Sequence, residues 1–212
     1  MNERNPMSAM ESVTIVAPLA LEADAVRRER PNAAVVEGGI ALSKLREPLR
    51  GTVVVCGVAG GLRGDLPTGT VLVPRRVRRP DGSEFECDAK LVAAFAASAR
   101  GLGVEPVFDS LLTAETIVNG AARLEWAARG YAGVDMETGL IQAPRVAAVR
   151  VVLDTPQHEL STDWVNPMRA ILKPSNWSQA LWLAREAPRA ARLAARVVTQ
   201  VIGSRLRITR QW

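Results

Sequence analysis

Three short segments of the chain carry acidic side chains in apolar surroundings. Glu22 lies in the run APLALEAD, Asp135 and Glu137 lie in GVDMETG, and Asp154 directly follows VRVVL. An acid at the edge of an apolar run can be a working group that exchanges protons with a ligand. Taken alone, each acid fits a structural role better, as a helix cap, a turn residue or a first-turn acid. Their position in the fold must decide between these roles.

A glycine-rich segment, CGVAGG over residues 56–61, follows an apolar β-branched run. Its three glycines, Gly57, Gly60 and Gly61, allow backbone N–H groups to approach a ligand closely, and they equally suit a tight strand-to-helix turn. The segment is not G-x-G-x-x-G and lacks the lysine of a P-loop, so it does not indicate a cradle for nucleotide phosphates.

The hydrophobic pattern predicts how these segments are arranged. Short apolar, β-branched runs predict strands at 13–17, 52–57, 70–77, 106–113 and 146–153, and helical patterns fall at 21–30, 91–102, 121–129 and 136–143. This alternation predicts an α/β fold with a buried, largely parallel sheet covered by helices. Ligands bind beyond the carboxyl ends of such strands, so Glu22, Glu137 and Asp154 are expected along one edge of the sheet.

The chain of 212 residues is expected to form one domain over 1–212. Residues 1–11 are polar and expected to be flexible, and 164–212 form a C-terminal helical segment. There we predict helices at 177–186 and 188–202, with Pro188 in the first turn of the second helix. The apolar runs are too short to span a membrane, and the first residues resemble no secretory signal. Cys56 and Cys87 fit free thiols in a reducing compartment. We therefore expect a cytoplasmic protein.

Charge and composition narrow the choice of partners. The net charge is +5, but the arginines are spread along the chain without the aromatic-interleaved pattern of a nucleic-acid module, so no nucleic-acid partner is expected. The single histidine, His158, is expected at the surface, and Cys56 is expected in the core. One histidine and two unpatterned cysteines leave no metal site, and no cofactor is expected.

Three acids around a glycine-rich segment suit the cleavage of an N-glycosidic bond. One acid must protonate the leaving base, one carboxylate must activate or position the nucleophile, and one must hold the sugar hydroxyls while positive charge develops on the sugar. A non-catalytic nucleoside-binding protein with the same fold stays an alternative, because fold does not guarantee chemistry.

The same segments, in this order, resemble the nucleoside phosphorylase and nucleosidase superfamily. The matching runs are CGVAGGL at 56–62 with PTGTVLVP at 67–74, VDMET at 134–138 and VRVVLD at 149–154. The resemblance implies a three-layer α/β/α sandwich with a mixed, largely parallel central sheet, the site at its carboxyl edge, and a homo-oligomer, with a homodimer expected.

The resemblance also implies roles for individual residues. Asp154 matches the acid that protonates N7 of the purine, and Glu22 matches the acid that activates water in the hydrolytic members. Glu137 matches the acid that holds the ribose hydroxyls, and Met136 packs beneath the sugar. The substrate-binding part of the glycine segment is Val58, Ala59 and Gly60.

Departures from the family pattern indicate which nucleophile is used. The resembling bacterial phosphorylases carry an Arg and a Ser at the positions of Val55 and Val58. A phosphate dianion needs charge-assisted donors, which valines do not supply, so a hydrolase is expected and a phosphorylase is the alternative. Leu153 stands where the adenosine-type nucleosidases have a Ser just before the purine acid.

Within the superfamily, the Gly-Val-Ala-Gly run at 57–60 and the C-terminal half, with its Trp-bearing stretch from Trp164 to Trp182, resemble the hopanoid-associated nucleosidases, which release adenine from adenosylhopane to leave ribosylhopane. Methylthioadenosine/S-adenosylhomocysteine nucleosidase and futalosine hydrolase are the alternatives. An enzyme that acts on a lipid needs an apolar pocket mouth. The C-terminal segment carries apolar side chains followed by arginines, a pattern that could contact the inner membrane peripherally. These residues are Trp177, Leu181 and Trp182, then Arg185, Arg189, Arg192 and Arg196. The alternative reading is a packing helix with a solvated arginine face.

Overall fold

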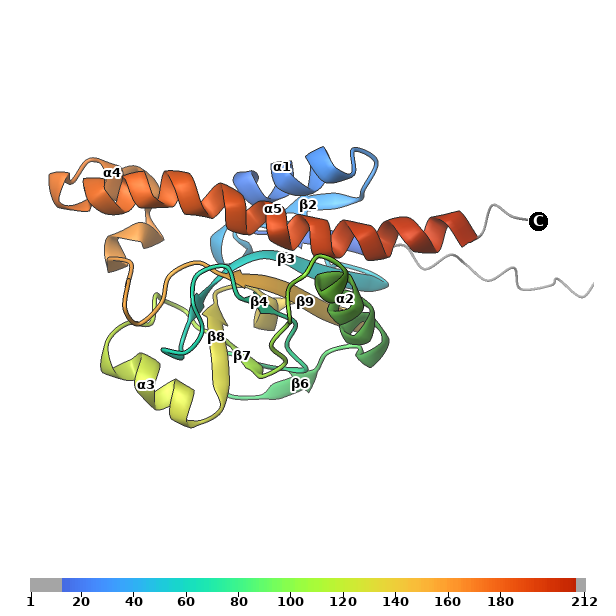
Figure 1. Ribbon diagram of the computed structural model, residues 1–212, viewed down its shortest axis with the longest axis horizontal. Coiled ribbons are helices and arrows are strands. Elements are labelled where there is room, and N and C mark those ends of the chain that lie inside the picture. Colours follow the sequence, from blue (N-terminus) through green and yellow to red (C-terminus); the bar gives the residue numbers. More distant parts are fainter. Residues whose placement is uncertain (1–12, 209–212) are drawn as a thin grey trace, which may run out of the picture.

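The computed structural model describes residues 13–208, so the segment 1–11 lies outside the described range. The chain folds around a nine-stranded sheet, with α1 and α5 on one side of it and α3 on the other (Figure 1). This confirms the predicted α/β/α architecture with a mixed, largely parallel sheet. The extent of the single domain over 1–212 stays a prediction.

One strand, β3, occupies the centre of the sheet. The strands are β1 (Val13–Ala17), β2 (Val35–Glu37), β3 (Thr52–Gly61), β4 (Val71–Leu72), β5 (Arg76–Arg78), β6 (Glu84–Glu86), β7 (Ser110–Thr113), β8 (Tyr131–Asp135) and β9 (Arg145–Val152). Their order is β2-β1-β3-β8-β7-β5-β6, and β9 pairs with β3 and β4. β1 and β9 run parallel to β3, so the three strands end at the same edge.

β3 is central because of its composition. It reads TVVVCGVAGG, and Val53, Val54 and Val55 are completely buried. β-branched side chains on both faces suit a strand that is covered on both sides. The last residues of β3, Gly60 and Gly61, pair antiparallel with β8, which brings the end of β8 to the same place as the end of β9.

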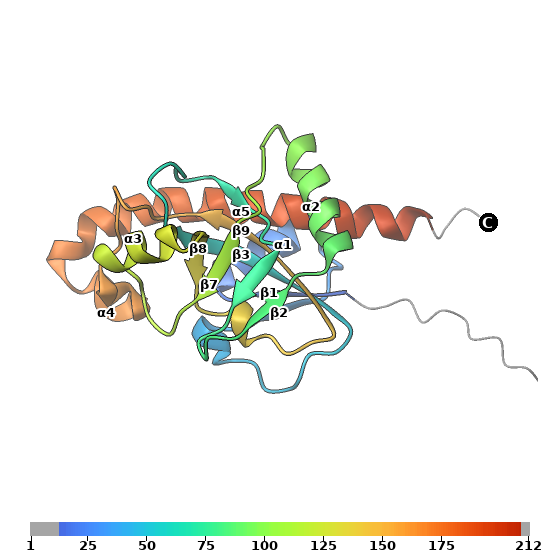
Figure 2. The same ribbon diagram turned by 90° about the horizontal axis from the view of Figure 1, so that it is seen from below.

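The helices enclose this sheet. They are α1 (Ala20–Glu29), α2 (Ala89–Gly101), α3 (Ala121–Ala128), α4 (Pro167–Ile171) and α5 (Trp177–Ile208), with 3-10 turns η1 (Ile40–Leu42), η2 (Thr138–Leu140), η3 (Thr162–Val165) and η4 (Pro174–Asn176). α5 packs against β3, β9, α1 and α2 and crosses the whole molecule (Figures 1 and 2).

The C-terminal segment differs from the prediction of two helices. α5 is continuous, and Pro188 lies inside it rather than in the first turn of a second helix. An internal proline costs one backbone hydrogen bond. The apolar face continues on both sides of it, from Leu183 and Ala187 to the buried Ala190, Ala191 and Ala194. Burial of this face on both sides of Pro188 offsets the lost hydrogen bond.

One other predicted element, the helix at 136–143, is wrong, and one strand was not predicted. Residues 136–143 form only the short turn η2, and the preceding residues form strand β8, which the sequence pattern did not reveal. Gly133, in the middle of β8, explains this, because it interrupts the apolar pattern. A Cβ at this position would lie 2.5 Å from the side chain of Leu72.

Two predicted strands are shorter than expected. The run at 70–77 divides into β4 and β5 at Pro74, which cannot donate a ladder hydrogen bond. The run at 106–113 keeps only its last four residues, as β7. Neither change moves the carboxyl edge at which the candidate site was expected.

Candidate active site

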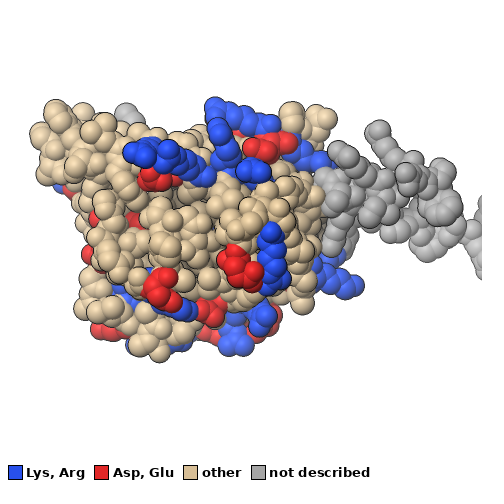
Figure 3. All heavy atoms as spheres, in the orientation of Figure 1, with Lys and Arg blue, Asp and Glu red and all other residues tan. Residues whose placement is uncertain are grey.

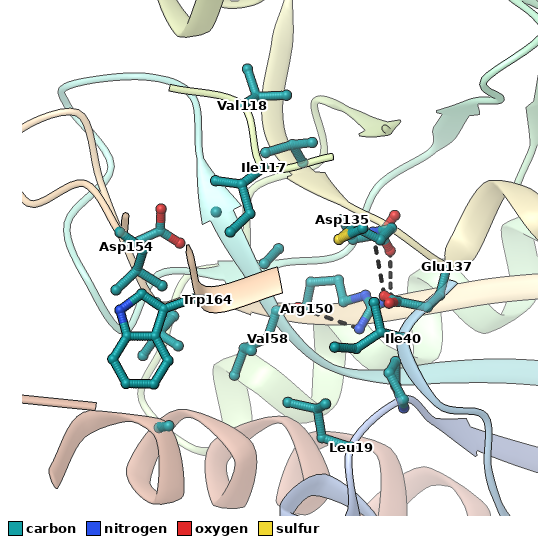
Figure 4. A pocket seen from close by; sticks show the side chains of 18 of the residues that line it. Leu19, Ile40, Val58, Ile117, Val118, Asp135, Glu137, Arg150, Asp154 and Trp164 are labelled. Atoms are coloured by element: carbon teal, nitrogen blue, oxygen red, sulfur yellow. Dashed lines mark hydrogen bonds and ion pairs between the residues drawn. The ribbon is translucent and has the colours of Figure 1, made fainter. Parts of the chain in front are cut away.

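A cavity of about 330 Å³ opens at the carboxyl ends of β1, β3, β8 and β9. All seven predicted site residues line it: Glu22, Val58, Ala59, Gly60, Met136, Glu137 and Asp154. Figure 4 shows Asp154 and Trp164 on one side of this cavity and Asp135, Glu137 and Arg150 on the other, with Val58 between them. The structure therefore brings together residues that are up to 132 positions apart in the sequence (154 − 22).

Glu22 reaches this cavity from the first turn of α1. Its carboxylate accepts hydrogen bonds from the backbone N–H groups of Leu19 and Val58, each at 2.8 Å. The residue is only 2% exposed, and burial raises its pKa, although the nearby Arg150 acts in the opposite direction. A carboxylate with a raised pKa is a better proton acceptor than one in water.

The glycine segment has a different role from the expected turn. It belongs to β3, and a Cβ on Gly57 would lie 2.2 Å from Oε1 of Glu22. Gly57 is therefore needed to admit the carboxylate of Glu22. Gly60 likewise leaves room for the carboxylate of Asp154, since a Cβ at residue 60 would lie 3.2 Å from Oδ1 of Asp154. The glycines allow two acids to lie close against the central strand.

On the other side of the cavity, a buried arginine joins two acids. Arg150 of β9 is completely buried, and its Nη2 lies 2.5 Å from Oδ2 of Asp135 and 3.3 Å from Oε2 of Glu137. Asp135 also accepts a 2.7 Å hydrogen bond from the Thr113 hydroxyl and others from Thr138. Asp135 thus holds Arg150 and the η2 turn together.

Glu137 is more weakly bound than Asp135. Its Oε1 accepts a hydrogen bond from the backbone N–H of Ala41 at 3.2 Å, and its Oε2 lies 3.3 Å from Arg150. Ala41 and Leu42 both have left-handed backbone angles, with φ of 50° and 57°, which is strained for residues other than glycine. Burial raises the pKa of Glu137 to about 7, and Asp135 and Glu22 add to the effect of burial against the attraction of Arg150. This carboxylate has capacity for a ligand hydroxyl.

Asp154 lies directly beyond β9 and has a charged partner of its own. Its carboxylate accepts a hydrogen bond from the guanidinium of Arg123, a side chain that is 1% exposed. The backbone carbonyl of Asp154 accepts a 2.7 Å hydrogen bond from the N–H of Gly61, which fixes the residue to the end of β3. Asp154 is therefore held by both its backbone and its side chain.

Two site residues were not predicted, Arg123 and Arg150. Arg150 had a signal: it is the charged residue in VAAVRVVL, and an ionised side chain in a strand buried on both faces must have an acidic partner. Arg123 had none, because a second arginine, Arg129, directly follows α3 and nothing in the sequence pattern separates the two. As expected, Cys56 lies in the core and His158 is exposed. The ring of His158 stacks on Trp182.

We expect the Glu137→Gln variant to be more stable than the wild type at pH 8 by up to about 3 kcal/mol, and by much less at pH 5. The pKa of Glu137 is raised from 4.5 to about 7, so its contribution to stability is complete below pH 4.5 and is lost as the pH rises through 7. Glutamine avoids this loss. Urea unfolding at both pH values measures the difference.

The exposed Glu86→Gln is the matched control for this variant and should change stability by less than about 0.5 kcal/mol at both pH values. An equal gain for Glu137→Gln at pH 5 and pH 8 would show that the change does not come from the ionisation of Glu137.

Comparisons with known proteins identify the family of the chain. The sequence profile of the Phosphorylase superfamily matches residues 30–201, which is most of the chain. The chain therefore belongs to this superfamily, as the motifs indicated. No curated protein sequence matches the chain significantly.

Solved structures of nucleosidases share the fold. A 5′-methylthioadenosine/S-adenosylhomocysteine nucleosidase of Helicobacter pylori, with 5′-methylthioadenosine in its active site, has a TM-score of 0.65 and 12% identity over 92% of this chain and 99% of its own. An S-adenosylhomocysteine nucleosidase of Streptococcus pyogenes has a TM-score of 0.67 and 15% identity over 92% and 98%. Futalosine hydrolase of Helicobacter pylori has a TM-score of 0.64 and 13% identity over 91% and 97%.

Proposed function

We propose that the protein is a purine nucleosidase that hydrolyses the N-glycosidic bond of an adenosine-type nucleoside. The observation that carries this proposal is the distribution of the acids: Asp154 lies on one side of a single cavity, across from Glu137, and Glu22 lines the same cavity. A nucleoside placed across the cavity would direct its base to Asp154 and its ribose to Glu137.

In this proposal each acid has one task. Glu22 takes a proton from water as the water oxygen bonds to C1′ of the ribose. The C1′–N9 bond breaks with its electrons passing to the base, and Asp154 gives a proton to N7. Glu137 accepts hydrogen bonds from the ribose hydroxyls while positive charge develops on the sugar, and Met136 lies beneath it. The products are adenine and the free sugar.

Water is a better candidate than phosphate for the nucleophile. Val55 is buried in the core, and Val58 offers the cavity no charged donor. Within the described part of the chain, the cationic side chains that line the cavity are Arg123 and Arg150, and both are already paired with carboxylates. Arg150 Nε is a buried donor without a protein partner, which suits a small polar ligand such as water.

The remaining wall of the cavity favours an apolar substituent at the ribose 5′ position. Its side chains include Leu19, Leu21, Ile40, Leu160 and Leu183 with Trp164. We propose that the substrate carries a large hydrocarbon group there, as adenosylhopane does. A 5′-methylthio group is also apolar, so a methylthioadenosine-type nucleosidase is the second candidate.

The test compares base release from adenosine, methylthioadenosine and an adenosine with a long 5′-alkyl chain, in buffers with and without phosphate. We expect adenine and free sugar without phosphate, with the highest kcat/KM for the alkyl substrate. A preference for methylthioadenosine would support the second candidate. Strict dependence on phosphate would indicate a phosphorylase, and saturable binding without base release would indicate a nucleoside-binding protein.

We expect Glu22→Gln to lower kcat by about a hundredfold while leaving nucleoside binding nearly unchanged. Glutamine keeps the acceptor for the N–H of Leu19 or Val58, but it cannot take a proton from water. Single-turnover hydrolysis and equilibrium binding of the nucleoside measure the two effects. Glu29→Gln, at the exposed end of α1, is the control. Near wild-type turnover for Glu22→Gln would remove Glu22 from the mechanism.

We also propose that an apolar surface near the cavity contacts an anionic membrane. Four exposed side chains form it: Ile171, Leu172, Trp177 and Leu181, with exposed fractions of 50%, 79%, 59% and 76%. This end of the molecule shows few charges in Figure 3, and basic side chains lie farther along α5. Trp182 does not belong to the surface, because it is partly buried and stacks on His158. Among the described residues, no helix is long and apolar enough to cross a bilayer.

Cosedimentation with liposomes tests this contact. We expect the wild type to bind liposomes with anionic lipids, and the variant Leu172→Ser/Trp177→Ser/Leu181→Ser to lose most of this binding while keeping its activity on soluble nucleosides. Point substitutions are preferable to deleting the end of the chain, because α5 packs on the central sheet. Leu124→Ser, at an exposed leucine of α3, is the control. Negligible binding of the wild type would contradict the proposal.

A further inference from the structure

Arg123 is an unusual residue for its helix. It is the only buried side chain of α3, and it is charged. A buried cation is costly unless its hydrogen bonds are satisfied. Here Nη1 donates to the carbonyl of Gly61 at 2.6 Å, Nε donates to the carbonyl of Val118 at 2.8 Å, and Nη2 donates to the carboxylate of Asp154.

These contacts join three parts of the cavity wall. Gly61 follows the cavity-lining residue Gly60 on β3, Val118 belongs to the cavity-lining loop before α3, and Asp154 is the acid on this side of the cavity. The planar guanidinium fixes the direction of its donors, so it defines where the carboxyl group of Asp154 lies relative to both other parts. A lysine would supply the charge without this geometry.

A second carboxylate accompanies Arg123. Oε1 of Glu159 lies 3.4 Å from Nε of Arg123, and the same oxygen accepts a 2.7 Å hydrogen bond from the N–H of Gly120. The side chain of Glu159 is 31% exposed, whereas that of Asp154 is 9% exposed. One cation is therefore shared by an acid in the cavity and an acid in contact with solvent.

We propose that Arg123 is a positioning residue for Asp154 and that Glu159 acts as its second counter-ion. This inference rests on the proposed function, in which Asp154 is the acid that protonates the leaving base. When Asp154 carries its proton, Glu159 balances the charge of Arg123. When Asp154 gives the proton to N7, its carboxylate pairs with Arg123. Asp154 then regains a proton from solvent, and Arg123 has an anionic partner in both states.

A double-mutant cycle separates this role from a purely structural one. We expect Arg123→Met to lower kcat for adenosine-type nucleosides about tenfold or more, with a smaller change in KM. In the Asp154→Asn background the same substitution should lower kcat by less than about threefold, because Arg123 acts through Asp154. A structural residue would lower kcat by the same factor in both backgrounds, and that result would overturn the inference.

Two further variants complete the test. Glu159→Gln keeps an acceptor for the N–H of Gly120 but removes the negative charge, so Asp154 becomes the only anionic partner of Arg123 among the two acids. We expect kcat to fall several-fold with KM unchanged. If Arg123→Met does not fold, Arg123→Lys replaces it in the cycle with the same expectation. Arg100→Met, at an exposed arginine of α2, is the matched control and should keep the wild-type rate.

The outcomes distinguish the two proposals. If the wild type releases no base, or if Asp154→Asn keeps the wild-type rate, the proposed function or its site is wrong. If Asp154→Asn is impaired and Arg123→Met or Glu159→Gln keeps the wild-type kcat, the proposed function stands and the inference about that residue is wrong.

Discussion

Replacing Asp154 by asparagine is expected to lower kcat for nucleoside hydrolysis by about a hundredfold or more. The amide has nearly the same shape as the carboxyl group and can accept a hydrogen bond from Arg123, but it has no acidic proton for N7. The backbone hydrogen bond from Gly61 to residue 154 does not involve the side chain, so the local fold should be retained. The effect should therefore appear in the chemical step.

Rates of base release under single-turnover conditions measure this loss, and binding of free adenine measures the integrity of the cavity. Asp65→Asn, at an exposed aspartate outside the cavity, is the control and should keep the wild-type rate. Turnover of Asp154→Asn within a few-fold of the wild type would contradict the role of Asp154 as the proton donor.

The sequence could predict the edge of the sheet where the site lies, because the relevant runs are short, apolar and β-branched. Glu22, Glu137 and Asp154 each follow such a run or a helix start, and the ends of parallel strands converge. Strand β8 was not predicted, because Gly133 interrupts its apolar pattern. The acids could thus be assigned to the site although the element that carries Asp135 to it was assigned wrongly.

The partners of these acids could not be predicted from local patterns. Glu22 lies against Gly57, and a glycine in a strand looks the same in sequence whether it forms a turn or admits a carboxylate. Arg123 is 31 residues from Asp154, and nothing in the pattern of α3 marks it as buried. Such pairings depend on tertiary packing, so they require the structure.

Replacing Arg150 by methionine is expected to destabilise the protein by about 3 to 5 kcal/mol at pH 8. Methionine fills a similar apolar volume, but it leaves Asp135 without the guanidinium that lies 2.5 Å away. Glu137 and Glu22 also lose the attraction that lowers their pKa values against burial. Three carboxylates would then share a buried region without a compensating cation. Urea unfolding measures the loss of stability.

Two measurements test whether the loss of stability in Arg150→Met is electrostatic: its dependence on pH, and the effect of a second substitution at Asp135. Protonation removes the repulsion, so the loss should be smaller at pH 5 than at pH 8, and adding Asp135→Asn to Arg150→Met should recover part of it. Arg76→Met, at a half-exposed arginine paired with Glu84 and Glu86, should cost less than about 1 kcal/mol. A loss for Arg150→Met that is independent of pH and of Asp135 would mean that packing, rather than charge, is what Arg150 supplies. The carboxylates on this side of the cavity would then not depend on the charge of Arg150.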